Sequence, residues 1–380
     1  MLILAAILAI FVYGVIASML GTIMPTFTFL TADQKGTVAF AQAMGLVVAS
    51  ISVGPLIDSK GKKTALVLGL ALIAAALFAL PSASSYGLLI IFFLLLGVGG
   101  GIVVTAANAL AGDVNEARRA SMLNFLNLFF GLGGLATPFI AANLLGGDAV
   151  RLCYLSAALA TIALIVQIVT RMPVPTGERG FKSAEVGRLL SRPVLYLLAF
   201  FLFLYVACEV GVWNWLSSYL ISRGIPQKNA LNILSLGFAL GLLVGRVIVS
   251  RILIKVSSIN VTLASSVLMA ITTFLMLRTS DPKIAWVAVF CAGLAMAPVF
   301  PTTLAIVGDA FPVMTATAMG LVITCGWIGL AVSSPIIGSV ATSSTLGNAL
   351  LILPGFSVVM ILVNAIIRPM LRDRAAAVKA

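Results

Sequence analysis

The sequence predicts an all-α membrane protein whose twelve transmembrane helices form two six-helix repeats. Of its 380 residues, 61% are hydrophobic and only 9% are charged. A soluble domain carries about 25% charged residues, so this chain has too little polar surface to cover a water-exposed globule. The apolar residues also fall into twelve runs, each near the roughly 20 residues that a helix needs to cross the hydrocarbon. The two halves of the chain repeat one spacing of glycine, aspartate and proline.

The twelve predicted spans are separated by short polar breaks. Helices suit a membrane because they satisfy their own backbone hydrogen bonds. The first run continues past the length of a signal peptide without a small-residue cleavage site, so we expect it to be retained as a membrane helix. The predicted spans are residues 2–30, 36–57, 64–81, 87–112, 120–144, 152–170, 194–222, 228–250, 258–277, 285–308, 316–342 and 348–368.

One long polar stretch, residues 171–193, separates the sixth span from the seventh. It contains three early prolines and then a basic, weakly amphipathic segment. We interpret it as a cytoplasmic linker. The predicted domains are therefore an N-terminal six-helix half (1–170) and a C-terminal half with a short tail (194–380).

Matched spacings indicate that these halves arose by duplication. The intervals from Gly97 to Asp113 and from Gly293 to Asp309 are both 16 residues, and each ends in a Gly-Asp pair. A proline follows the first aspartate after 25 residues and the second after 26. Six spans separate the copies, so the two halves share the same orientation in the membrane.

The distribution of lysine and arginine predicts the orientation. If both termini are cytoplasmic, 17 of the 23 cations lie on the inner side and 6 on the outer side. The positive-inside rule favours this arrangement, and we expect a bacterial-type inner membrane. The asymmetry accounts for the net charge of +12 without a nucleic-acid partner.

Composition also excludes several kinds of chemistry. The chain has no histidine, and its four cysteines lie in apolar runs without CxxC spacing. Histidine-based catalysis and histidine or CxxC metal sites are therefore excluded, and we expect neither an enzyme nor a bound metal or cofactor. A passive channel would need a repeated polar lining in an oligomer. Here polarity is concentrated in spans four, five and seven of one chain, so we expect a monomer.

A loop between the second and third spans resembles the signature G-x-x-x-D-R-x-G-R-R/K of the major facilitator superfamily. Ser59 replaces the usual first arginine. The resemblance implies the major facilitator fold, and it implies that this loop gates movement by holding the inner ends of the halves together. A generic basic turn is the alternative. We expect Gly54 to permit close helix approach and Gly61 to take a positive φ. The matching residues are Gly54, Asp58, Gly61, Lys62 and Lys63.

Shorter motifs resemble the fucose-permease-like family of fucose, galactose and glucose:proton symporters. Thr105-Ala106-Ala107-Asn108 is similar to its E-T-A-A-N stretch, and Asn124-x-x-Asn127 is similar to its N-x-x-Q/H. Tyr205-Val-Ala-Cys-Glu209 resembles Y-V-G-A-E in span seven. A Phe-Pro-Thr element in span ten is also similar to one in related sodium-dependent glucose carriers.

Two acids of that family are missing from this chain. Val104 stands where the family has glutamate before T-A-A-N, and Gly21 stands where an acid is usual in span one. Proton coupling through those two positions cannot be transferred from the family.

Glu209 is the one acid well inside an apolar run. A charged acid at the centre of a membrane helix costs roughly 2.5–3.5 kcal/mol, so it needs a partner, a cavity or a proton. Burial favours the neutral carboxyl, which suits a group that binds and releases a proton. A sodium site and a structural hydrogen bond between helices are the alternatives.

Polar and aromatic side chains inside the spans predict a central solute site. Amides can donate to and accept from sugar hydroxyls, and aromatic rings can stack on sugars. The alternative for any single residue is that it joins helices. The predicted site residues are Gln42, Thr105, Asn108, Asn124, Asn127, Tyr205, Trp213, Asn214, Thr324 and Trp327.

The sequence therefore predicts a secondary active transporter for a small hydroxylated solute, a hexose sugar, working by alternating access. Coupling through Glu209 to a proton is favoured over coupling to sodium. Export of drugs or other amphipathic solutes and uncoupled sugar uniport are the alternatives, because the two family acids are absent.

Overall fold

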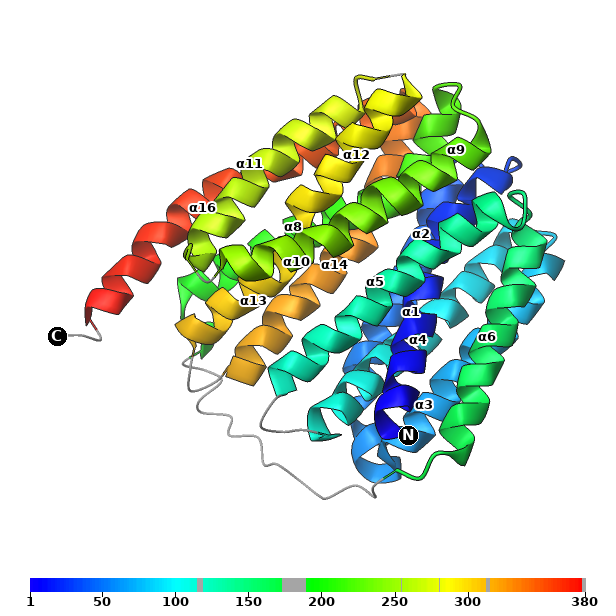
Figure 1. Cartoon of the computed structure of the whole chain (residues 1–380), viewed down its shortest axis with the longest axis horizontal. Helices are drawn as coiled ribbons and strands as arrows, with labels where there is room; N and C mark the ends of the chain where they lie inside the picture. Colours follow the sequence, from blue (N-terminus) through cyan, green and yellow to red (C-terminus); the bar gives the residue numbers. More distant parts are fainter. Residues whose placement is uncertain (115–118, 173–188, 254, 280, 312–314, 378–380) are drawn as a thin grey trace. The chain divides into compact units, whose positions relative to one another are not determined.

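A computed structural model describes residues 1–114, 119–172, 189–253, 255–279, 281–311 and 315–377 (Figure 1). Within those ranges the regular structure consists of α-helices with short 3-10 and π segments, and no strand occurs. Twelve helical segments of this part of the chain are long and apolar enough to cross a membrane. The predicted all-α fold with twelve spans is confirmed.

The first six spans match the six predicted runs. Thr31 and Gln34 form a capping box at the start of the second helix, and Asp148 caps the sixth by accepting from the Arg151 backbone N–H at 3.0 Å. The elements are α1 (Leu2–Ile23) with η1 (Met24–Thr26), α2 (Ala32–Ser52), α3 (Gly54–Ala79) with η2 (Leu80–Ser82), α4 (Tyr86–Val114), α5 (Arg119–Asn143) and α6 (Ala149–Val169).

Three of the last six spans are interrupted. A π-helical segment divides span eight, Pro298 precedes the second part of span ten, and a break at Leu351 divides span twelve. The elements are α8 (Pro193–Ser222), α9 (Gln227–Asn232), η4 (Ile233–Ala239), α10 (Leu240–Ile252), α11 (Ser258–Met276), α12 (Pro282–Met296), α13 (Val299–Ala310), α14 (Thr315–Ser343), α15 (Leu346–Leu350) and α16 (Ile352–Ala377).

The paired prolines of the predicted repeat occupy equivalent spans. Pro138 lies inside α5, the fifth span of the first half, and Pro335 lies inside α14, the fifth span of the second. Membrane helices tolerate internal proline because neighbouring groups satisfy the freed carbonyl. The structural equivalence supports the duplication that the spacing predicted.

The chain divides into two compact units. The first contains Met1–Arg179 and Trp213–Ala239, and the second contains Gly180–Val212 and Leu240–Ala380. The end of α8 and the start of span eight thus pack with helices of the first half. Residues 173–188 of the predicted linker lie outside the described residues, so the boundary between the halves stays a prediction.

Glycines allow close helix packing in both units. In the first, a Cβ at Gly101 of α4 would lie 2.5 Å from the Leu46 carbonyl oxygen of α2. In the second, a Cβ at Gly245 of α10 would lie 2.5 Å from the Ala297 methyl group. Small residues at helix contacts are what membrane helices use to approach one another. Gly241 of α10 packs equally closely, because a Cβ there would collide with the Phe290 carbonyl oxygen of α12.

Candidate functional site

The second unit contains a cluster around Glu209. Tyr205, one turn earlier on α8, is fully buried, and its hydroxyl donates a hydrogen bond to the Glu209 carboxylate. Arg246 of α10 lies close enough for its charge to act on the Tyr205 hydroxyl. The structure therefore brings two predicted site residues together and adds a cation from a neighbouring span.

Arg246 lies inside a membrane span. The sequence-based count includes it among the inner-side cations, and it lies near the end of the span Gln227–Val249 and is half-buried. Without it the predicted inner side keeps 16 cations against 6, so the asymmetry remains. The signal that could have identified Arg246 is its place inside a predicted apolar run, because an intramembrane cation needs an anionic partner.

The predicted residues of α2 and α4 differ in their hydrogen bonding. Gln42 Nε2 donates to the Ile16 carbonyl of α1 at 3.1 Å, and Thr105 Oγ1 donates to the Gly101 carbonyl of its own helix at 2.9 Å. Asn108 is half-buried, and no hydrogen bond joins its side chain to another residue that the structure describes. Asn108 therefore keeps an amide available for a solute, whereas Gln42 joins two helices.

The remaining predicted residues lie on three helices. Asn127 of α5 is exposed, Thr324 of α14 donates to the Gly320 carbonyl at 2.9 Å, and Trp327 of α14 is half-buried. Asn214 of α8 is 7% exposed. The side chains of Asn124 and Asp58 lie outside the described part of the chain.

Trp213 groups with the first unit. Its ring meets the Phe238 ring edge to face, with centroids 5.2 Å apart, and a Cβ at Gly134 would lie 3.3 Å from it. Tyr205 and Glu209 belong to the second unit. Stacking of a sugar on the rings of Tyr205 and Trp213 stays a prediction.

Residues 213–239 pack on α1 and α5 within the first unit, and we name this packed contact the 213–239 seam. The Ser217 hydroxyl donates to the Gly21 carbonyl of α1, and the Ser235 hydroxyl donates to the Leu135 carbonyl of α5 at 2.7 Å. Asn143 Nδ2 donates to Asn232 Oδ1 at 2.6 Å, and Asn232 Nδ2 donates back to Asn143 Oδ1 at 3.3 Å. The seam joins two spans of the second half to two of the first through polar contacts.

Gly21 permits the closest approach in this seam. A Cβ built there would collide with the Trp213 carbonyl oxygen. The position where the resembling family has an acid therefore has no room for a side chain in this conformation. Sequence motifs could not indicate this reason for glycine, because the contact joins residues far apart in the chain.

Of two expectations for the glycines of the signature loop, one is confirmed and one is wrong. Gly61 has φ 85° and kinks α3 between its two helical parts, as predicted. A Cβ at Gly54 would meet no described atom within 4 Å, so Gly54 does not serve close helix approach here. Lys63 Nζ donates to the Ile168 carbonyl at the end of α6 at 2.6 Å. This contact places a cation at a helix C-terminus, where it is favourable.

Sequence comparisons identify relatives that match most of the chain at low identity. The chain is 22% identical over 381 residues to Bypass of stop codon protein 6 of Saccharomyces cerevisiae, covering 89% of this chain and 76% of that protein. It is 24% identical over 346 residues to protein TsgA of Shigella flexneri, covering 90% of this chain and 87% of the relative.

Solved structures share the fold. The nucleoside transporter NupG aligns with a TM-score of 0.78 at 14% identity, covering 96% of this chain and 98% of NupG. A D-xylose-proton symporter aligns with a TM-score of 0.74 at 14% identity, covering 93% of this chain and 96% of the symporter. A variant of the Escherichia coli fucose:proton symporter FucP aligns with a TM-score of 0.66 at 18% identity, covering 96% of this chain and 98% of FucP.

The sequence profile described as Major Facilitator Superfamily matches residues 2–258 and, again, residues 227–379. The two matches together cover nearly the whole chain, in agreement with its repeated halves. The chain therefore belongs to the Major Facilitator Superfamily, and it is a multi-pass membrane transporter rather than an enzyme.

Proposed function

We propose that the chain is a secondary active transporter that couples movement of a small hydroxylated solute, a hexose-like sugar, to a cation bound at Glu209. The observation that carries the proposal is the Glu209 cluster. The one acid well inside an apolar run is hydrogen-bonded by the buried Tyr205, with Arg246 nearby. Intramembrane ionisable residues with such partners commonly mark ion pathways.

The cluster suits a carboxyl that alternates between two charge states. When Glu209 is charged, the Tyr205 hydroxyl and the nearby positive charge of Arg246 stabilise it. When a proton or sodium ion binds, the attraction to Arg246 weakens, and the helices α8 and α10 can change their spacing. Coupling follows because cation binding then shifts the balance between two conformations. A proton is favoured over sodium.

The solute class rests on polar chemistry and on the structural neighbours. Asn108 offers an amide donor and acceptor without a described partner, which suits a hydroxyl. Two of the neighbours are named as proton symporters of xylose and fucose, and a third as a nucleoside transporter, whose solutes also carry a hydroxylated ring. The remaining predicted residues are proposed to complete the site.

Uncoupled sugar flux and export of amphipathic solutes form the second candidate. Gly21 and Val104 favour it, because neither position supplies the acid that the resembling family uses. Accumulation against a gradient separates the candidates, since an uncoupled carrier only equilibrates its solute.

The seam supports alternating access. In the seam, the parts of spans seven and eight that lie farther from the linker pack against α1 and α5. If both termini are cytoplasmic, this end faces outward, and the seam is packed there. Release of the seam would expose the solute path to the outside.

Uptake into proteoliposomes tests the proposal. Wild-type protein is given a panel of hexoses, pentoses, nucleosides and amphipathic drugs, with proton and sodium gradients imposed separately. We expect a hexose to accumulate with an imposed proton gradient. Equilibration without accumulation under either gradient would support the uncoupled candidate, and accumulation of the drugs alone would contradict the sugar proposal.

Glu209→Gln tests coupling in the same assay. The amide keeps the shape of the side chain but cannot carry a charge, so we expect solute exchange to remain and accumulation to be lost. Tyr205→Phe is the matched control, because it removes the hydrogen bond and leaves the acid in place. Accumulation should fall only partially in that variant. Full accumulation by Glu209→Gln would assign the residue a structural role.

Asn108→Ala tests solute binding. An unpaired polar group in a dry site costs about 1–3 kcal/mol, so the dissociation constant of the transported sugar should rise about 5- to 150-fold. Asn348→Ala, in an exposed helix start, is the matched control. Equal affinities in the two variants would move the solute site away from Asn108.

A further inference from the structure

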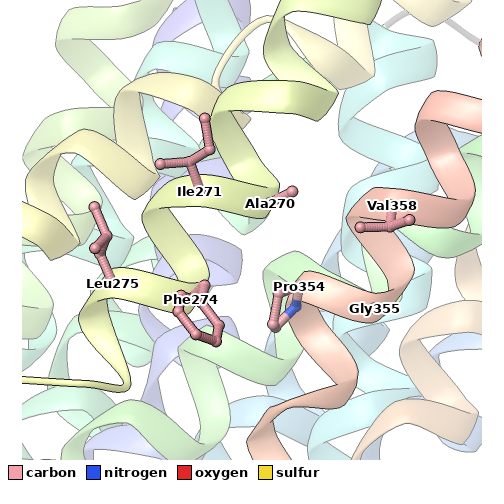
Figure 2. Close-up of a pocket in the computed structure, with 7 residues that line it drawn as sticks. All are labelled: Ala270, Ile271, Phe274, Leu275, Pro354, Gly355 and Val358. Atoms are coloured by element: carbon pink, nitrogen blue, oxygen red, sulfur yellow. The ribbon is translucent and has the colours of Figure 1, made fainter.

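The second unit has an apolar groove between α11 and α16 (Figure 2). Its volume is about 430 Å³, and its walls come from Ala270, Ile271, Phe274 and Leu275 on one side and from Pro354, Gly355 and Val358 on the other. Ile271 and Val358 are 51% and 50% exposed, so the groove opens on the outer surface of the unit. Because both helices are membrane spans, this surface faces lipid.

The groove results from uneven contact along the two helices. Near the start of α11, Asn364 Nδ2 of α16 donates to Thr262 Oγ1 at 2.8 Å, and Arg368 Nη2 donates to Asn260 Oδ1 at 2.8 Å. Polar pairs therefore fix the helices together at one end. At the other end Gly355 has no side chain, and a Cβ there would meet nothing within 4 Å.

A cation lies beside the groove. The Arg278 guanidinium carbon is 4.9 Å from the centre of the Phe274 ring, which lines the groove. With 19 residues, α11 is about 28 Å long and matches the roughly 30 Å hydrocarbon thickness. Arg278 follows this helix by two residues and so lies at headgroup depth. Ala270, eight residues earlier, lies about 12 Å deeper.

Arg278 has an exposed charge that described carboxylates do not neutralise. No ion pair joins it to an acid in the part of the chain that the structure describes. Nearby Asp281 instead caps α12 by accepting from the Lys283 and Ile284 backbone N–H groups at 2.7 and 3.4 Å. Arg278 is also on the side with few cations, where the positive-inside rule gives it no topological role.

We infer that this groove is a phospholipid site in the leaflet away from the linker, with one acyl chain between α11 and α16 and the phosphate on Arg278. An open apolar groove beside a cation at headgroup depth matches the shape and charge of a phospholipid. Guanidinium groups bind phosphate through paired hydrogen bonds, which favours phosphate over an uncharged headgroup.

Native mass spectrometry of the purified full chain, titrated with lipid in detergent, tests the inference. The titrants are phosphatidylglycerol, phosphatidylethanolamine, phosphatidylcholine and the phosphate-free diacylglycerol. Two variants address the two parts of the site. Gly355→Leu fills the groove, and Arg278→Gln removes the cation. Gly87→Leu is the matched control, because Gly87 is exposed and a Cβ there also meets nothing within 4 Å.

We expect wild-type protein and Gly87→Leu to retain one tightly bound phospholipid that diacylglycerol does not replace. Each methylene group displaced should weaken binding about fourfold, so Gly355→Leu should lower the affinity at least about tenfold. Arg278→Gln should lower the affinity for the phospholipids and leave that for diacylglycerol unchanged. Unequal affinities among the three phospholipids would identify the preferred headgroup within this proposal.

Three results would overturn the inference. They are equal lipid retention by Gly355→Leu and Gly87→Leu, binding of diacylglycerol as tight as that of the phospholipids, or a dimer that Gly355→Leu disrupts. Thermal unfolding of each variant in lipid-free detergent distinguishes a loss of lipid binding from a general loss of stability. We expect Gly355→Leu to unfold at the wild-type temperature.

Discussion

At the scale of single residues, Gly21 connects local sequence to conformation. Its missing side chain lets α1 approach the Trp213 carbonyl, so any larger residue must separate α1 from α8. We predict that Gly21→Ala shifts the protein away from the closed seam. A cysteine at Ser235, which is fully buried in the seam, should then react faster with an impermeant thiol reagent in a background lacking the native cysteines.

The control for this prediction is Gly320→Ala. A Cβ at Gly320 meets nothing within 4 Å, so the same substitution there leaves packing unchanged. Labelling of the Ser235 position should match that of the parent protein in this control. If Gly21→Ala also labels at the parent rate, the close approach does not control the seam.

Asp58 gives a second prediction at this scale. The signature loop contains the Gly61 kink, and its Lys63 binds the end of α6. By family resemblance the loop stabilises one end state, so Asp58→Asn should slow transport more than it weakens solute binding. Transport and equilibrium binding are compared at equal surface expression. Unchanged transport kinetics would contradict a gating role for this loop.

Single residues also mark the limits of sequence reasoning. Glu209 and Tyr205 were identified from one apolar run and one helical spacing, and the structure joins them. Arg246 was counted with the inner-side cations because it lies near the end of its run. Its relation to Tyr205 depends on how α10 packs on α8, and neither hydropathy nor spacing contains that information.

At the scale of elements, hydropathy located all twelve spans because the membrane imposes one dominant requirement on each. It did not indicate the π-helical η4 segment. In a π-helical segment the backbone hydrogen bonds join residues five apart instead of four, and such segments are frequent at functional sites. Ser235 within it donates to Leu135 of α5, so the segment belongs to the seam.

The reciprocal amide pair of Asn143 and Asn232 provides a test of the seam as a moving part. We predict that cysteines at both positions, in a background lacking the native cysteines, form a disulfide on oxidation and stop transport. A disulfide needs Cα atoms within about 7 Å, so its formation also tests how closely α5 and α9 approach each other. Activity should return on reduction. The doubly substituted serine variant is the control for loss of the amides.

Oxidised protein that still transports at the reduced rate, with the disulfide verified by mass spectrometry, would show that the seam stays closed throughout the cycle. This outcome would separate the seam from alternating access. It would leave the Glu209 proposal intact, because Glu209 lies in the other unit.

At the scale of the whole molecule, duplication explains why one set of short motifs predicted so much of the fold. Equivalent Gly-Asp pairs and prolines occupy matching spans in each half, and the family profile matches twice. The repeat predicts the solute site less well than the fold, because the predicted site residues are distributed over both units. Solute recognition depends on the distances between them, which no spacing along the chain encodes.

Orientation is a property of the whole molecule and gives the last prediction. An even number of spans places both termini on one side of the membrane. With 16 cations on the linker side against 6 on the other, the positive-inside rule predicts that the termini and the 171–193 linker lie in the cytoplasm. Single cysteines in the linker and at Ser344, in the exposed turn before α15, report the two sides.

An impermeant thiol reagent added to intact cells should label the Ser344 position and leave the linker unlabelled until the membrane is permeabilised. The reverse pattern would invert the topology, and the closed seam would then face the cytoplasm. Solute uptake would have to begin at the opposite end of the protein, so this measurement also fixes the direction in which the seam must open.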